Sequence, residues 1–242
     1  MAAELKDFTL EDLEKLSGYI PELANFPRRL LANTYQDFVD VLYEDLESII
    51  AEMQLNPELM KDDGEDRISL ELKRTLNVLG YKATHDEKIG GHSDIAVRHR
   101  RNFLWIGEAK IHSGYDYLFQ GFQQLCTRYS TGDEGQDCGG LLIYIKTNNA
   151  ADVIKNWRAD LQGRGLQDYS DHDNATRSTF VFNSTHKHDR SGTPFKVRHI
   201  GVILGFEPKD KDVRQRKKKA ADATAKPVKE RKPRAPRKAS AA

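Results

Sequence analysis

Two carboxylates and a lysine have the types and spacing needed for phosphate chemistry: Asp94, then Glu108, with Lys110 two positions beyond it. The run 103–111 is aromatic and β-branched, which predicts a buried strand. Because side chains alternate along a strand, Glu108 and Lys110 project from the same face. Residues 94–97 predict the partner strand of a hairpin, which would bring Asp94 close to Glu108. Such a patch can hold a divalent cation and direct water at a phosphate.

The same side chains could instead form a surface salt bridge, which would contribute about 0–1 kcal/mol. However, Glu108 and Lys110 lie at the end of a strand that is too apolar to be an exposed edge strand. Burying charges there costs several kcal/mol unless a metal or a partner compensates. The pattern therefore favours a functional site.

A helix is predicted over residues 65–79, directly before this hairpin. At 100° per residue, one side collects Ile68, Leu72, Leu76 and Leu79. Glu65 falls inside that arc, so its carboxylate is expected to point toward the sheet, whereas Glu71 lies at the edge and is the weaker candidate. The alternative for Glu65 is an acid that only stabilises the helix N-terminus.

Taken with its flanking elements, the motif at positions 94 and 108–110 resembles the PD-(D/E)xK nuclease superfamily, over about residues 64–146. The resemblance includes the preceding helix and the turn Gly90-Gly91 before the first acid. Ser93 departs from it, standing where the family name has proline. The pattern is most similar to Mrr-type restriction endonucleases and archaeal Holliday-junction resolvases. It implies an α/β fold with a restriction-endonuclease-like αβββαβ core and a central mixed sheet.

The resemblance also implies a Mg²⁺-dependent endonuclease that hydrolyses DNA in restriction, phage defence or repair, with Mn²⁺ able to substitute. Asp94, Glu108 and the carbonyl of Ala109 would bind the metal, since magnesium prefers oxygen ligands. Lys110 would orient or help deprotonate the attacking water, or neutralise charge at the phosphate. Glu65 would be the helix acid that helps hold the metal through water. The alternatives are a catalytically inactive nuclease-fold DNA-binding protein and a regulatory protein.

Residues 115–130 predict one amphipathic helix. Its apolar side comprises Tyr115, Leu118, Phe119, Phe122, Leu125, Cys126 and Tyr129. Gln120, Gln124 and Arg128 gather with Tyr117 on the opposite side, where they either contact a nucleic-acid backbone or simply face solvent. His112 shares the face of the acid–lysine motif and is a further candidate for phosphate contact.

Charge is distributed unevenly along the 242 residues, although the whole chain carries only +1. Residues 209–242 hold fourteen Lys or Arg and four Asp or Glu, a net charge of +10 that includes Lys217, Lys218 and Lys219. This segment lacks an apolar period and is expected to be disordered. Polycations bind DNA by releasing counterions, without reading sequence. A solubility tail, or one that contacts RNA or anionic lipid, is the alternative.

The first 62 residues form an acidic helical arm, with five Lys or Arg against fourteen Asp or Glu. We expect a short helix over 9–17, capped by Thr9, and a long helix over 27–54. The apolar stripe of the long helix either packs on the core or pairs with another subunit in a homo-oligomer. The chain thus divides into the arm 1–62, a nuclease domain 63–208 and the basic tail 209–242.

The remainder predicts a strand over 139–146, a helix over 151–161 and a polar loop. Two further strands, 178–183 and 196–206, are expected around a loop that exposes His186 and His188. Cys126 and Cys138 fit reduced intracellular thiols. With no signal peptide or long apolar run, the prediction is a cytoplasmic protein, nucleoid-associated if bacterial, with no membrane partner.

Deleting residues 209–242 is expected to weaken DNA binding and to flatten its salt dependence, because each neutralised phosphate contributes roughly −0.9 to the slope of log K against log salt. Fluorescence anisotropy with a labelled duplex at several salt concentrations measures that slope. An identical slope with and without these residues would refute the predicted role.

Overall fold

Seven strands form one mixed sheet, in the order β1-β4-β5-β6-β9-β8-β7, in the computed structural model, which describes residues 9–20 and 25–209. The strands are β1 (Lys82–Thr84), β4 (Ile95–Arg98), β5 (Leu104–Ile111), β6 (Cys138–Ile145), β7 (Ser170–Asp173), β8 (Val181–Lys187) and β9 (Pro194–Ile203). Strands β5, β6 and β9 run parallel, and the other neighbours pair antiparallel. The predicted α/β class with a central mixed sheet is confirmed.

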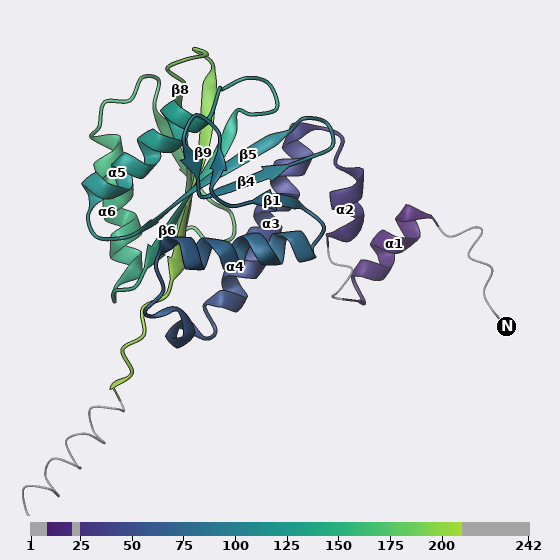
Figure 1. Cartoon of the computed structure of the whole chain (residues 1–242), viewed down its shortest axis with the longest axis horizontal. Helices are drawn as coiled ribbons and strands as arrows, with labels where there is room; N and C mark the ends of the chain where they lie inside the picture. Colours follow the sequence, from purple (N-terminus) through teal and green to yellow (C-terminus); the bar gives the residue numbers. More distant parts are fainter. Residues whose placement is uncertain (1–8, 21–24, 210–242) are drawn as a thin grey trace, which may run out of the picture. The chain divides into compact units, whose positions relative to one another are not determined.

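Helices cover both faces of this sheet (Figure 1). One face carries α3 (Tyr35–Met53) and α4 (Glu65–Val78). The other carries α5 (Tyr115–Gln123), the π-helical segment η4 (Gln124–Tyr129) and α6 (Ala150–Gln162). The short elements are α1 (Leu10–Ser17), α2 (Phe26–Leu31), the 3-10 turn η3 (Pro57–Met60) and the hairpin strands β2 (Glu87–Lys88) and β3 (His92–Ser93).

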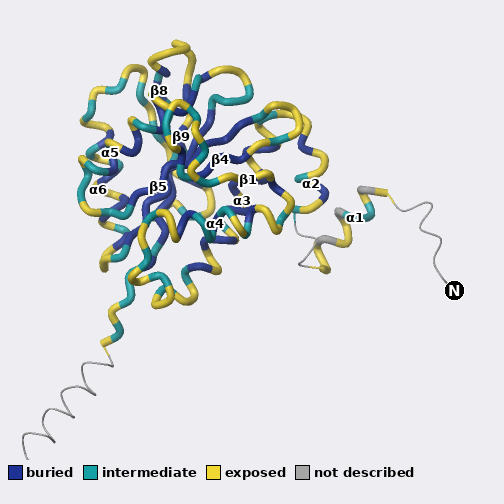
Figure 2. The backbone as a smooth tube through the Cα atoms, viewed as in Figure 1, coloured by how far each residue is buried: buried dark blue, intermediate teal, exposed yellow. Residues whose placement is uncertain are grey.

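Strand β5 is buried along almost its whole length, as the dark central strands of Figure 2 show. Trp105 and Ala109 belong to the core on the α3 and α4 face, whereas Leu104 and Ile106 belong to the core on the α5 face. This alternation has the period of two that a strand imposes. Glu108 is in phase with Leu104 and Ile106 and therefore lies on the α5 face.

The long helix predicted over 27–54 is two helices. Ala32 leaves helical geometry at φ −54° and ψ 104°, and α3 then begins after Thr34, which forms a capping box with Asp37. A new N-cap of this kind competes with continued helix by satisfying backbone donors locally. The apolar stripe of α3 is buried in the core against the sheet, so packing within the chain is what the structure has.

The single helix predicted over 115–130 changes type at Gln124. Its last turns are π-helical, with Ser130 N donating to Leu125 O at 3.2 Å, five residues back. The wider turn keeps the predicted apolar side in the core.

Two predictions for the C-terminal part of the sheet were wrong. Residues 170–173, expected in a loop, form the edge strand β7, because their backbone pairs with β8. His186 and His188, expected to be exposed, are only 5% and 1% exposed. Strand β8 continues to Lys187, so alternation turns His186 inward, where its ring lies 5.1 Å from that of Phe122.

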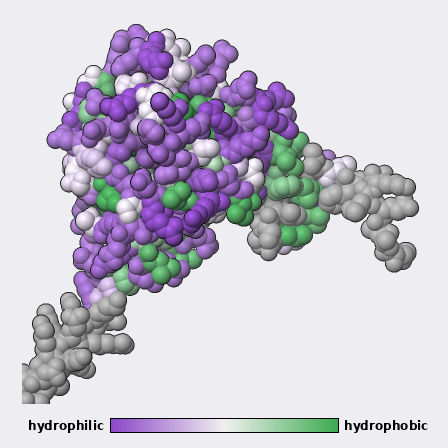
Figure 3. Space-filling view, viewed as in Figure 1, coloured by the Kyte–Doolittle hydropathy of each residue, from purple (hydrophilic) through white to green (hydrophobic). Residues whose placement is uncertain are grey.

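Exposed apolar side chains gather on α2, where Phe26, Leu30 and Leu31 are each about 40% exposed. Figure 3 shows a hydrophobic patch at the place of α2 on an otherwise mostly hydrophilic face. Among the described helices, none is both long and apolar enough to cross a membrane.

A buried ion pair joins α2 to α3. Arg29 Nη1 lies 3.0 Å from both carboxylate oxygens of Asp45, and the two side chains are 9% and 6% exposed. Asp45 also accepts from Tyr81 OH at 2.6 Å. At the preceding position of each helix, Arg28 pairs with Glu44, but those side chains are 42% and 50% exposed. Burial therefore distinguishes two neighbouring pairs of the same chemistry.

Replacing Arg29 with methionine should lower the free energy of unfolding by about 3 kcal/mol, because it leaves the buried Asp45 charge without its cation. The matched change Arg28→Met should cost less than about 1 kcal/mol, since solvent screens that pair. Urea unfolding followed by circular dichroism measures both values. Equal losses for the two variants would contradict the importance of burial.

Candidate functional site

Asp94 lies between β3 and β4, directly across from Glu108. The register pairs Ile95 with Gly107 in antiparallel strands. Asp94, which precedes Ile95, therefore faces Glu108, which follows Gly107. Asp94 Oδ2 accepts a hydrogen bond from Ala109 N at 2.7 Å, which fixes its carboxylate beside the strand. The hairpin predicted from the sequence therefore brings the first acid to the second.

Glu108 and Lys110 form a buried ion pair. Lys110 Nζ lies 2.5 Å from Glu108 Oε1 and 3.1 Å from Ala109 O. Glu108 is 2% exposed and Lys110 is 7% exposed. The alternative of a solvated surface salt bridge therefore does not describe these side chains.

The electrostatics of the cluster follow from this burial. Desolvation, with repulsion from Asp94 added, raises the pKa of Glu108 to about 8. Desolvation also raises the pKa of Asp94. Burial alone would lower the pKa of Lys110, but attraction to Glu108, Asp94 and Glu65 outweighs it, so the pKa of Lys110 is raised. The site thus concentrates negative charge in a poorly solvated place, where a cation is strongly favoured.

Glu65, at the start of α4, reaches the same place from the opposite helix layer. Its Oε1 accepts from Ile111 N at 2.7 Å and from Tyr117 OH at 3.0 Å, and its Oε2 lies 4.0 Å from Lys110 Nζ. Glu71, the weaker candidate, lies 3.8 Å from Arg74 with a side chain that is 43% exposed. The structure therefore brings Glu65 to the cluster and leaves Glu71 on the helix surface.

The oxygens of the cluster suit a hard cation. Glu108 Oε1 and Ala109 O, two of the predicted metal ligands, both accept from the Lys110 ammonium. Glu108 Oε2 is buried without a hydrogen-bond partner among the described residues, an arrangement that is costly unless something satisfies it. The described part of the chain contains no group of three or more His, Cys, Asp or Glu side chains arranged for a metal, and the predicted set has only two such side chains.

The residues predicted to contact nucleic acid are spread over several environments. Gln120 and Arg128 are exposed, and Gln124 is half-buried with no partner for its Oε1 among the described residues. Both ring nitrogens of His112 are buried, and burial lowers the pKa of that ring, which packs 5.4 Å from the ring of Tyr115. Lys217, Lys218 and Lys219 lie outside the described residues.

Two aromatic residues near the cluster were not predicted as site residues. Tyr117 was placed on the polar side of its helix, but its hydroxyl donates to Glu65. Tyr129 was assigned only to the core. Burial and the negative charges of Glu108 and Asp94 raise the pKa of its phenol to about 12. Helical spacing from Tyr115 could have indicated the direction of Tyr129, but nothing local links either ring to an acid that is distant in the chain.

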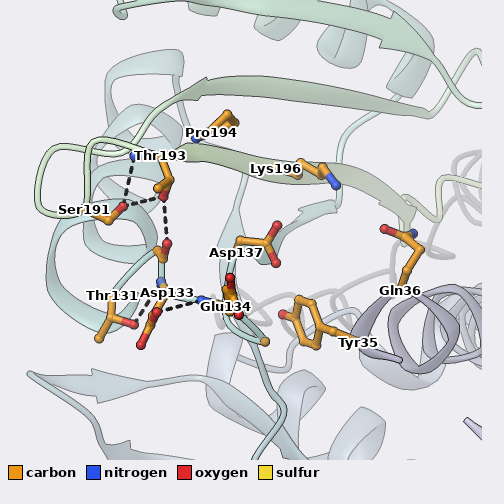
Figure 4. Close-up of a pocket in the computed structure, with 12 residues that line it drawn as sticks. Tyr35, Gln36, Thr131, Asp133, Glu134, Asp137, Ser191, Thr193, Pro194 and Lys196 are labelled. Atoms are coloured by element: carbon orange, nitrogen blue, oxygen red, sulfur yellow. Dashed lines mark hydrogen bonds between the residues drawn. The ribbon is translucent and has the colours of Figure 1, made fainter. Parts of the chain in front are cut away.

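A cavity of about 910 Å³ opens elsewhere, where β6 and β9 begin (Figure 4). Asp137 and Lys196 line it, with Asp133 and Glu134 on a neighbouring loop. Asp133 and Glu134 are exposed to solvent. None of the clustered acids lines this cavity, so the cavity is separate from the acid cluster.

Comparison with family models, curated proteins and solved structures found no match for the chain. A fold by itself does not define an activity. Function must therefore be inferred from the chemistry of the clustered side chains.

Replacing Glu65 with alanine should speed hydrogen exchange at the Ile111 amide by about tenfold or more, because a hydrogen bond to a charged acceptor contributes roughly 1.5–3 kcal/mol. Glu71→Ala on the same helix is the matched control and should leave that amide unchanged. Exchange measured by NMR gives both rates. Unaltered protection of Ile111 in the Glu65 variant would show that this contact does not hold the strand end.

Proposed function

We propose that the protein is a metal-dependent nuclease of the PD-(D/E)xK type that hydrolyses phosphodiester bonds in DNA. The observation that carries the proposal is the convergence of Asp94, Glu108 and Lys110 on one face of the β4–β5 hairpin, where Glu108 and Lys110 are buried. Charged side chains with no function are usually solvated at the surface. Two carboxylates side by side, here the half-buried Asp94 and the buried Glu108, are typical of functional sites.

The order of elements around the cluster supports the same proposal. Helix α4 precedes β1, β4 and β5, and α5 then leads to β6. Apart from the small β2–β3 hairpin, this is the αβββαβ order that the resemblance implies. Asp94 directly precedes the second strand of this order, Glu108 lies on the third, and Glu65 lies on the first helix.

Asp94, Glu108 and the carbonyl of Ala109 would hold a divalent cation, with Mg²⁺ the expected ion and Mn²⁺ a substitute. When bound, such an ion would stabilise charge on the phosphate oxygens and lower the pKa of coordinated water. The unpartnered Oε2 of Glu108 and the raised pKa values of both acids support this assignment, because each reflects a negative site that lacks compensation.

Lys110 provides a positive charge and a proton-bearing amine at the same place. Its ammonium, now on Glu108 and Ala109, could orient a water molecule or neutralise charge on the phosphate. Glu65 holds the end of β5 through Ile111 N, which keeps that amine near both acids. Exposed Gln120 and Arg128 on the adjacent helix are available to the DNA backbone.

Purified protein should cleave plasmid or linear DNA with Mg²⁺ or Mn²⁺ and stop when the metal is chelated. Asp94→Ala, Glu108→Ala and Lys110→Met should each lose cleavage by about 10²-fold or more, because they remove groups that act in the transition state. Gel assays measure the rates, and melting curves check the fold.

Metal affinity separates the roles of these residues. Calorimetric titration with Mn²⁺ should show weaker binding for the Asp94 and Glu108 variants, which lose ligands. Lys110→Met should bind Mn²⁺ at least as tightly as the wild type, because the competing ammonium is gone. Retained DNA binding without cleavage by the wild type on any DNA form would instead indicate an inactive nuclease fold.

A further inference from the structure

The aliphatic stem of Lys110 runs against α5 at Gly121. A Cβ placed on Gly121 would lie 2.7 Å from Lys110 Cγ and 3.0 Å from its Cε. Contacts under 3.0 Å between such atoms require something to move. Because Lys110 is only 7% exposed, its stem has little free volume into which it could shift.

The backbone conformation does not require glycine at position 121. Gly121 lies in the interior of α5 and its φ is not positive. On helix propensity alone, alanine is the better residue in a helix interior. The close approach of Lys110 accounts for the missing side chain.

Tyr117 lies one turn before Gly121 on the same side of α5, since residues four apart share a helix face. Its ring centroid is 5.6 Å from Lys110 Nζ, within the range of a cation–π contact. Its hydroxyl donates to both carboxylate oxygens of Glu65, at 3.0 and 3.2 Å. One residue thus touches the end of the lysine and holds the acid beyond it.

We propose that Tyr117 and Gly121 are positioning residues that set the Lys110 amine between Glu108 and Glu65. The missing side chain of Gly121 leaves a slot, which is the space beside α5 that the aliphatic stem of Lys110 occupies. Tyr117 contacts the Lys110 ammonium with its ring and holds Glu65 with its hydroxyl. The amine consequently reaches Glu108 at 2.5 Å and stays 4.0 Å from Glu65. The catalytic part of this inference rests on the proposed nuclease function, whereas the position of the Lys110 amine does not depend on it.

Gly121→Ala is the direct test, because its methyl group would displace the stem while favouring the helix. We expect kcat for DNA cleavage to fall at least tenfold with KM for DNA within twofold of wild type, since small misplacements of reacting groups lower rates strongly. Gly163→Ala, at the end of α6, is the matched control. There a Cβ meets its nearest neighbour at 3.4 Å, and the variant should keep wild-type kcat.

A second measurement does not depend on activity. Under brief treatment with an acetylating reagent, mass spectrometry gives the labelling rate of Lys110, which should rise at least fivefold in Gly121→Ala and stay unchanged in Gly163→Ala. Tyr117→Leu removes the ring and hydroxyl without adding bulk, so it should also raise the labelling rate and lower kcat. This variant serves as the test if Gly121→Ala fails to fold, as judged by melting.

Wild-type labelling and wild-type kcat in Gly121→Ala, or in Tyr117→Leu as the replacement, would overturn the slot while leaving the nuclease proposal intact. Faster labelling in a protein whose wild type cleaves no DNA would support the slot and overturn the nuclease proposal.

Discussion

Burial of the Glu108–Lys110 pair beside Asp94 is the constraint on which the rest of the site depends. Removing such groups from water costs several kcal/mol per ion, and attraction recovers this only with good geometry. The structure supplies that geometry with a 2.5 Å ion pair and with a backbone donor for Asp94. Desolvation, with repulsion from Asp94 added, still raises the pKa of Glu108. These contacts therefore hold the cluster together, although the single Lys110 ammonium does not balance the carboxylates around it.

The surrounding elements follow from the need to hold these groups. Strand β5 is central and buried, which gives Glu108 and Lys110 a fixed direction. Helices from both layers then meet at its end, where Glu65 from α4 accepts from Ile111 N and from Tyr117 of α5. Three elements are thereby joined through one carboxylate, which gives an acceptor to both Ile111 N and Tyr117 OH.

Local patterns were sufficient for much of the fold. The aromatic and β-branched run 103–111 predicted the buried strand, alternation predicted the shared face of Glu108 and Lys110, and the cap at Thr9 predicted α1. Errors arose where a second cap or pairing with a distant segment decided the structure. The break before α3 depends on a second cap at Thr34, and the inward turn of His186 depends on how far β8 pairs with β9. Strand length and pairing partners come from contacts between distant segments.

The sequence by itself determined which chemical groups exist and their phase along each element: period two on β5 placed Glu108 and Lys110 on one face, and period 3.6 directed Glu65 toward the sheet. Only the tertiary structure decided that the Lys110 amine rests on Glu108, and that Tyr117 reaches Glu65. The contacts of Glu65 with Ile111 N and with Tyr117 OH join α4 to the end of β5 and to α5, between residues 46 and 52 positions apart in the chain. Local propensities do not determine contacts between residues so far apart in the chain, because those contacts depend on how two helices pack on opposite faces of one sheet.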